Sequence, residues 1–398
     1  MASGPRRSRF LPAISCAWQA FVTPTTAWLA LPAVASAAYW LLAIVAAGRW
    51  RRALGHGVSA PVPAPNQPIS ILKPVHGRDP HFYDAIRSHA LQDYPEYEIL
   101  FGIGRANDPA AGDIRRLIAE FPSRRIRLIV TSTKMPNAKV GVLADLAAQA
   151  RYPLLLINDS DIRVEPCYLR DVAPLLDRAG VGLVTCLYRA LSENWPGRWE
   201  ALGVATEFAP SVLVARLLGS VEFALGSTML LRAADLSRIG GFAAIGGYLA
   251  DDYQLGRRIR ALGLRVVFAP PVVETHLDGA TWAAVWRHQL RWSRGIRVSR
   301  PGGYFGYLIT HATFWSLVAL AAGAWRVGLA ALAIRILAGI WVGRGVLRDP
   351  LVLRRAWWIP FRDLWGFAIW LCGLFGNQVE WRGAHMRLSR DGKILKDR

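Results

Sequence analysis

The chain has few cysteines. Its 398 residues include only four, Cys16, Cys167, Cys186 and Cys372, and no two of them are close in the sequence. Their spacing, taken with the histidines, matches no structural zinc motif. Sparse, unpaired cysteine is typical of a reduced compartment, so a catalytic domain that faces the cytoplasm is the simpler interpretation.

The chain is also short of acidic residues. It has 28 Asp and Glu against 48 Lys and Arg, which gives a formal net charge of +20. Such a balance is typical of nucleic-acid binding or of contact with anionic lipid headgroups. The arginines lie beside apolar runs, which favours the membrane and predicts no nucleic-acid partner. They are Arg6, Arg7, Arg9, Arg49, Arg51, Arg52, Arg344, Arg348, Arg354 and Arg355.

Long apolar runs mark both ends of the chain. Residues 26–47 carry no charge and could cross roughly 30 Å of hydrocarbon. A cleavable signal peptide is the alternative, but the run is long and begins deep in the chain, so we expect a retained anchor after a basic segment, 1–25. A second membrane region is expected at 301–378. Its apolar segments are 304–324, 328–342 with Arg335 in its middle, and 364–376, which is short for a crossing.

Charge sets the expected orientation. The loop 343–362 is strongly basic, and basic loops of membrane proteins stay in the cytoplasm. Two crossings before that loop would place the catalytic domain on the same side. We therefore expect an integral protein of a bacterial inner membrane with a cytoplasmic catalytic domain. The tail, 379–398, is basic too, so the topology after a third apolar segment stays open.

A catalytic domain is expected at 69–300, after a Pro-rich linker at 48–68. Short apolar runs alternate with amphipathic stretches there, which predicts an α/β fold with a mainly parallel sheet. The expected strands are 69–72, 97–103, 126–130, 154–157, 181–185 and 266–268. The expected helices are 84–91, 110–120 and 136–150.

Two carboxylates follow the apolar strand at 154–157. Asp159 and Asp161 are separated by one residue, and ligands of open parallel sheets bind outside the carboxyl ends of the strands. Hard oxygen ligands there suit a divalent cation that holds a diphosphate. A turn and a helix cap at a strand end would explain the same residues.

A second acidic pair follows a glycine-rich stretch. Asp251 and Asp252 lie where they could complement the dipole of a new helix. Alternatively, one of them is the general base for an acceptor hydroxyl. Adjacent carboxylates can raise each other's pKa, which would suit that task.

Basic and aromatic residues complete the set. Residues 286–294 interleave cations with tryptophans and include Arg291 and Trp292. They could bind phosphate and stack on a sugar, or form an amphipathic helix at the membrane surface. Lys73 and Asp108 follow strands, and Asn137 and Lys139 lie at a helix start, where a nucleotide or its phosphate could bind. Each of these four also fits an ordinary surface loop. His276 is a weaker metal-ligand candidate and is left out.

The order of these motifs resembles the inverting glycosyltransferases of the GT-A nucleotide-sugar fold, and more closely the ceramide glucosyltransferase family. The matching stretches are 71–74, 107–110, 158–164, 250–253 and 291–292. They occur in family order over residues 69–300, with an anchor before them and apolar segments after them. The stretches 184–189 and 208–212 also look like bacterial transferases that act on hopanoid polyols.

The resemblance implies a role for each matching residue. Asp108 would contact the nucleotide, Asp159 and Asp161 would hold a metal-bound diphosphate, and Asp252 would be the catalytic base beside Asp251. Arg291 and Trp292 would close over the diphosphate and the acceptor, and Asn137 and Lys139 match an Asn-x-Lys element of related transferases. The motif departs from the family pattern at His288, where Gln or Arg is usual, and at Asp251, where Glu is usual.

The expected reaction is transfer of a hexose, glucose first, from a UDP-sugar to a lipid hydroxyl with inversion. The expected cofactor is Mg²⁺ or Mn²⁺, and the acceptor is ceramide or, alternatively, a hopanoid polyol that receives glucosamine or its N-acetyl form. The growing end of a polysaccharide is a further alternative, although its export needs more spans than this chain offers. An alternative of another class is a non-enzymatic basic protein of the membrane or of nucleic acid, whose nucleic-acid affinity would be salt-sensitive.

Overall fold

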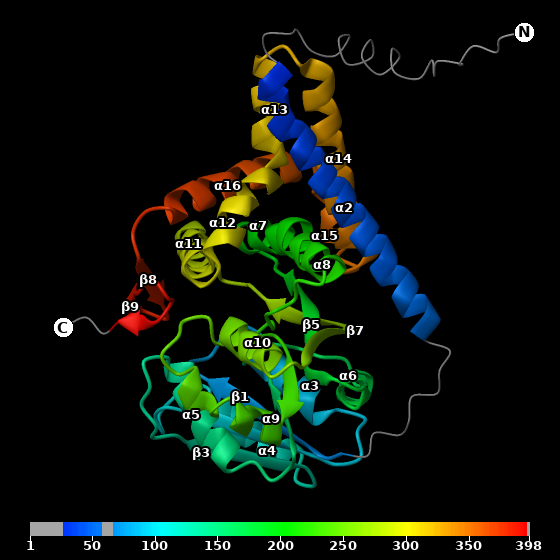
Figure 1. Cartoon of the computed structure of the whole chain (residues 1–398). Coiled ribbons are helices and arrows are strands. Elements are labelled where there is room, and N and C mark those ends of the chain that lie inside the picture. Colours follow the sequence, from blue (N-terminus) through cyan, green and yellow to red (C-terminus); the bar gives the residue numbers. More distant parts are fainter. Residues whose placement is uncertain (1–26, 58–66, 396–398) are drawn as a thin grey trace, which may run out of the picture.

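The computed structural model describes residues 27–57 and 67–395 (Figure 1). The basic segment 1–25 lies outside the described residues, as do residues 58–66 of the expected linker. A seven-stranded sheet forms the expected catalytic part, in the order β3-β2-β1-β4-β6-β5-β7. Its strands are β1 (Ile69–Val75), β2 (Tyr97–Ile103), β3 (Arg125–Val130), β4 (Leu154–Ile157), β5 (Val181–Leu191), β6 (Met229–Arg232) and β7 (Arg265–His276).

The sheet is mainly parallel, as expected. Strand β6 is the exception, because it runs antiparallel to both β4 and β5. All residues of β1, β2 and β4 are buried, which explains their continuous apolar runs, since helices cover both faces of such strands. Leu72, Leu100 and Leu155 belong to one of the two large apolar clusters, while Ile71, Ile99 and Leu156 belong to the other.

Helices connect and cover the strands. Those that the sequence predicted are α3 (Phe82–Ala90), α4 (Ala111–Glu120) and α5 (Ala138–Ala148). The others in this part are α6 (Tyr168–Leu176), α7 (Trp195–Gly203), the π-helix η1 (Val204–Phe208), α8 (Ala209–Leu217), α9 (Ala233–Arg238), the short η2 (Phe242–Ala244), α10 (Asp251–Ala261) and α11 (Trp282–Ser299). Helix α11 lies between the sheet and the apolar helices (Figure 1).

The apolar helices form a bundle at the end opposite the catalytic sheet, where α2 (Ala27–Gly57) runs beside α13 (Ala312–Ala321) and α14 (Trp325–Gly345) (Figure 1). Within the described residues, Trp28–Gly55 and Trp325–Gly345 are long and apolar enough to cross a membrane. Helix α2 continues past the expected anchor boundary at residue 47 and ends at Gly57. Arginine does not end the helix, because it is itself a good helix former.

The segment expected as one span at 304–324 is broken. It consists of α12 (Pro301–Gly306), η3 (Tyr307–Thr310) and α13, with a bend of 52° between Pro301–Thr310 and Ala312–Ala321. After α14 come the short α15 (Leu351–Arg354), η4 (Ala356–Trp358) and α16 (Ile359–Gly373). Helix α16 has 15 residues, too few for a full crossing at 1.5 Å per residue.

The tail also differs from the expectation. Residues 379–398 were expected to be a basic tail, but the chain forms a small antiparallel sheet of β8 (Gln378–Trp381), β9 (Ala384–Leu388) and β10 (Ile394–Leu395). This C-terminal sheet lies beside α11 (Figure 1). Its apolar residues are few, but Val379 and Leu388 pack with Leu249 in a buried cluster.

A buried ion pair accounts for the arginine inside the α14 span. The side chain of Arg335 is fully buried, its Nε lies 3.2 Å from Oδ1 of Asp363 on α16, and its guanidinium lies 3.9 Å from the ring centre of Trp40 on α2. Asp363 also accepts a 2.7 Å hydrogen bond from the backbone N–H of Thr313 on α13. These contacts join four helices of the bundle. They follow the general rule that charged side chains within a bundle of membrane helices face its interior and pair there.

Replacing Asp363 should therefore weaken the bundle. Asp363→Ala leaves the buried Arg335 charge with the more distant Glu207, 4.0 Å away, as its acidic partner, so we expect a loss of ~3 kcal/mol of stability. The double variant Arg335→Met/Asp363→Leu should recover most of it. Thermal unfolding in detergent micelles measures both, with Arg344→Met, an exposed position on the same helix, as the control. If Asp363→Ala melts like the control, the pair does not support the bundle.

Candidate active site

The residues singled out in the sequence meet at one edge of the sheet. Because β1, β2 and β4 are adjacent and parallel, their carboxyl ends share that edge. Lys73 of β1 is fully buried, and its Nζ donates a 3.0 Å hydrogen bond to the backbone oxygen of Asp159. Burial lowers the pKa of Lys73 to about 7, against the opposing effect of Asp161 and Asp159. Lys73 therefore binds the turn that carries the first acidic pair.

Lys139 joins the two acidic pairs. Its Nζ lies 2.7 Å from Oδ1 of Asp159 and 3.2 Å from Oδ2 of Asp251. Burial acts to lower the pKa of Lys139, but the charges of Asp159 and Asp251 raise it above its ordinary value. The ammonium group therefore stays charged and neutralises part of the repulsion among the carboxylates.

Asn137 fixes the position of Lys139. It caps the start of α5, where its side-chain oxygen accepts from the backbone N–H of Val140. Its Nδ2 donates a 2.9 Å hydrogen bond to the backbone oxygen of Tyr248, in the loop that leads to Asp251. The side-chain oxygen of Asn137 makes the N-cap hydrogen bond. The amide hydrogens are therefore available to bind the backbone of the segment that precedes Asp251.

Asp159 needs a glycine beside it. A Cβ at Gly226, just before β6, would lie 2.8 Å from Oδ2 of Asp159 and 3.5 Å from Nζ of Lys139. The backbone oxygen of Gly226 also accepts a 3.2 Å hydrogen bond from the N–H of Asp159. Only glycine lets the backbone approach the carboxylate this closely.

Asp161 is held from the far side of the site by β7, where the Thr275 hydroxyl donates to its Oδ2. Burial raises the pKa of Asp161, and the neighbouring charge of Asp159 raises it further. A positive charge between Asp159 and Asp161, in addition to Lys73 and Lys139, would therefore be favourable.

Asp252 is the most perturbed carboxylate of the second pair. Both Asp251 and Asp252 lie in the first turn of α10, so the helix-dipole interpretation is compatible with a catalytic one. Burial raises the pKa of Asp252 to about 6, and the charge of Asp251 adds to this effect. A carboxyl group with such a pKa is suited to proton transfer near neutral pH.

Arg291 and Trp292 lie on α11, at the boundary of the site. Burial lowers the pKa of Arg291, while Glu200, Asp159, Asp252 and Asp251 oppose the shift by their charge. The guanidinium lies 5.7 Å from the ring centre of Trp381. Trp292 does not reach the carboxylates through any described contact, since its ring packs on His288 and Phe208.

Sequence reasoning missed Glu200 and Trp381. Glu200 on α7 is buried and shares a hydrogen bond with Nδ1 of His288, the residue that departs from the family pattern. Neither has a local signal, because a single acid on a helix and a tryptophan in a basic tail resemble surface residues. Their placement depends on contacts between distant segments.

Asp108 reaches the same edge of the sheet, but its carboxylate is engaged in loop contacts. Its Oδ2 accepts a 3.0 Å hydrogen bond from the N–H of Gly77, and its Oδ1 accepts one of 2.9 Å from Ala110. Asp108 therefore ties the loop after β1 to the start of α4. A contact with the nucleotide stays a prediction.

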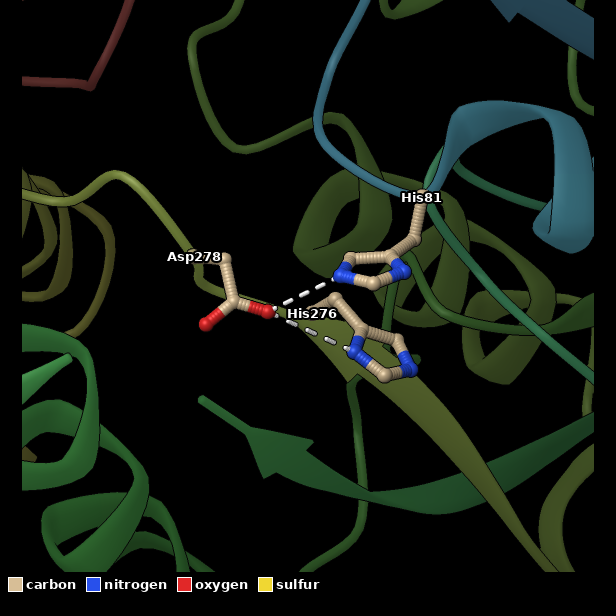
Figure 2. A group of neighbouring side chains, drawn as sticks. All are labelled: His81, His276 and Asp278. Atoms are coloured by element: carbon tan, nitrogen blue, oxygen red, sulfur yellow. Dashed lines mark hydrogen bonds and ion pairs between the residues drawn. The ribbon is translucent and has the colours of Figure 1, made fainter. Parts of the chain in front are cut away.

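His276 faces a different group. Figure 2 shows its ring beside His81 and Asp278, with ring centres 4.5 Å apart and His81 Nε2 3.1 Å from Oδ2 of Asp278. A cavity of about 390 Å³ adjoins them. Asp278 also accepts from Ser192 Oγ at 3.0 Å, so it ties the segment after β7 to the loop after β5.

The sequence is similar to known ceramide glucosyltransferases. Ceramide glucosyltransferase 1 of Caenorhabditis elegans is 28% identical over 211 residues, 52% of this chain and 45% of that protein. Ceramide glucosyltransferase 3 of the same organism is 27% identical over 229 residues, 57% of this chain and 49% of that protein. The chain thus spans about half the length of these relatives.

A solved structure shares the fold. The mannosyltransferase PcManGT from Pyrobaculum calidifontis, in complex with GDP-Man and Mn²⁺, aligns with a TM-score of 0.51 at 19% identity and covers 87% of this chain and 99% of its own. This likeness shows the GT-A-type fold of the catalytic sheet. The model of glycosyl transferase family 21 matches residues 26–394, and the chain therefore belongs to that family.

Proposed function

We propose that this glycosyltransferase transfers glucose from UDP-glucose to the hydroxyl of a membrane lipid of the ceramide class, with inversion. The observation that carries the proposal is the convergence of two acidic pairs, 159/161 and 251/252, around the Lys139 ammonium. The names of the C. elegans relatives support the sugar and the acceptor, and the two apolar helices support an acceptor held in a bilayer.

Asp159 and Asp161 fit a divalent cation such as Mg²⁺ or Mn²⁺. Both offer hard oxygen donors, and burial together with the charge of Asp159 raises the pKa of Asp161, so a bound cation would be favourable beside them. When bound, such a cation would neutralise charge on the diphosphate leaving group. Mn²⁺ accompanies GDP-Man in the structurally similar mannosyltransferase, which supports the same pairing of metal and nucleotide-sugar.

Lys139 and Arg291 supply positive charge from the protein itself. Lys139 approaches the site from the start of α5, and Arg291 approaches it from α11. Cations placed on both sides of a diphosphate stabilise the charge that develops as the bond to the sugar breaks. We assign them this role in the departure of UDP.

Asp252 acts as the base. Its carboxylate takes the proton of the acceptor hydroxyl as that oxygen attacks the anomeric carbon, and the bond from that carbon to UDP breaks with its electron pair leaving on UDP. Attack from the face opposite UDP inverts the configuration. Asp251 stays ion-paired with Lys139 and holds the start of α10 in place.

The acceptor reaches the site from the bilayer. Helix α11 carries Arg291 toward the carboxylates and packs its other side on α16, so the site adjoins the apolar helices. We place the protein in a bacterial inner membrane with the catalytic sheet in the cytoplasm, where the basic loop 343–362 would also lie.

Asp252→Asn tests the base. We expect transfer to fall by about 10²–10⁴-fold, because the amide cannot take the proton, while UDP binding stays largely intact. Labelled UDP-glucose and UDP-N-acetylglucosamine, each with ceramide and with a hopanoid polyol, measure the activity and identify the substrates. Asp171→Asn, an exposed first-turn position on α6, is the matched control. Normal turnover in Asp252→Asn would remove Asp252 from the mechanism.

The pH profile tests the raised pKa. An aspartate whose pKa is raised to about 6 is protonated below that pH, so kcat/KM should fall as the pH drops through about 6. In Asp251→Asn one neighbouring negative charge is gone, so this acid limb should move to lower pH, even if the rate itself is reduced. An acid limb that does not move would contradict coupling between the two carboxylates.

A further inference from the structure

The C-terminal sheet β8–β10 contacts three separate parts of the candidate active site. Its first contact is with the loop 246–250, directly before Asp251. The N–H of Ile394 donates a 2.8 Å hydrogen bond to Gly247 O, and the N–H of Leu249 donates one of 3.3 Å to Gly392 O. On its other side this loop is held by Asn137. The segment that presents the second acidic pair is thus fixed between α5 and the C-terminal sheet.

The second contact is with α11. Trp381, the last residue of β8, lies under the guanidinium of Arg291 at 5.7 Å from the ring centre, and Arg287 pairs with Glu380 at 3.3 Å. A cavity of about 200 Å³ opens between the two elements, lined by Arg287, Arg291 and Arg294 of α11 and by Gln378, Glu380 and His385. Trp381 therefore contacts the arginine whose charge interacts with Asp159, Asp251 and Asp252.

The third contact is with the loop after β1. Trp381 pairs with Ala384 across the hairpin turn, so Arg382 and Gly383 form a two-residue turn, both with positive φ, 48° and 78°. Such turns favour Asn-Gly or Gly-Gly, and an arginine in this conformation is strained. Its guanidinium donates to the backbone oxygen of His76 and lies 3.2 Å from Oδ2 of Asp79.

Arg382 binds the loop 76–79, which we place in the pocket for the nucleotide-sugar donor, called the donor pocket. Residues 76–79 follow β1, which ends with Lys73, Pro74 and Val75, and the N–H of Gly77 donates a hydrogen bond to Asp108. Asp79 also contributes to the raised pKa of Asp161, which places it in the same electrostatic group. A strained arginine at a hairpin tip, bound to this loop, is the kind of outlier from which function can be inferred.

We propose that the β8–β9 hairpin is the closing wall of the donor pocket, in which Arg382 positions the loop 76–79 and Trp381 positions Arg291. This inference rests on the proposed function, since it concerns the pocket for the nucleotide diphosphate. By this proposal the donor pocket includes residues of the C-terminal sheet, which are far along the chain from the acidic motifs.

Arg382→Ala in the full-length protein tests the proposal. We expect the KM for the UDP-sugar and the Kd for UDP to rise roughly tenfold, because a charge-assisted contact to the loop is lost. The KM for the lipid and the melting temperature should stay near those of the wild type. Arg387→Ala is the matched control, because Arg387 is exposed on the same sheet and its loss changes the net charge equally.

Trp381 gives a second, independent variant. Trp381→Ala should raise the Kd for UDP, and Trp381→Phe should restore most of the binding, since a flat ring under Arg291 is kept. If Arg382→Ala and Trp381→Ala bind UDP as the wild type does, or if they lose donor and lipid affinity equally together with melting temperature, the hairpin is only structural. A wild-type protein that binds no nucleoside diphosphate would instead overturn the proposed function, and this inference with it.

Discussion

The charge of Lys139 is the constraint on which the active site depends. It lies between two acidic segments, one at the end of β4 and one at the start of α10, which are about ninety residues apart in the chain. Without a cation there, the carboxylates of Asp159 and Asp251 would face each other in a partly buried site, where like charges repel strongly. Burying an ion pair gains little net stability, and its main effect is to specify one arrangement of its neighbours. Here that arrangement is the one that brings the acidic pairs together.

Much of the catalytic sheet could be predicted from the sequence because its strands are buried on both faces. The bounds of β2 and β4 were predicted correctly: Gly104 follows β2, and Pro153 and Asn158 flank β4, and such residues mark the ends of strands. Strand β6 was missed: its apolar run is only residues 229–231 before Arg232, and no local pattern indicates that it is inserted antiparallel between β4 and β5. Asp159 and Asp161 were found because the ends of parallel strands share an edge.

Other features could not be predicted, because they depend on pairs of distant segments. Nothing near Asn137 indicates that its amide binds the loop before Asp251, or that Glu200 meets His288. The C-terminal sheet buries only a few apolar side chains. Its sequence is therefore mostly polar and basic, and it was interpreted as a basic tail. Arg335 weakened the prediction of a span at 328–342, although the arginine is compatible with the helix once Asp363 and Trp40 face it.

Helix α11 presents one face to the apolar helices and another to the C-terminal sheet. Gln289 and Ser293, one turn apart, face α16, where Gln289 accepts a 2.8 Å hydrogen bond from Trp365 and Ser293 donates to the backbone of Ile369. Arg287, Arg291 and Arg294 follow the same helical spacing on another face, toward the C-terminal sheet. Residues three or four apart share a face of a helix, so one helix serves both the apolar bundle and the carboxylates. Because α11 is one continuous helix, the position of Arg291 is fixed relative to the bundle as well as to the sheet. The proposed transfer from a water-soluble sugar nucleotide to a lipid needs that fixed relation, since the two proposed substrates approach from different solvents.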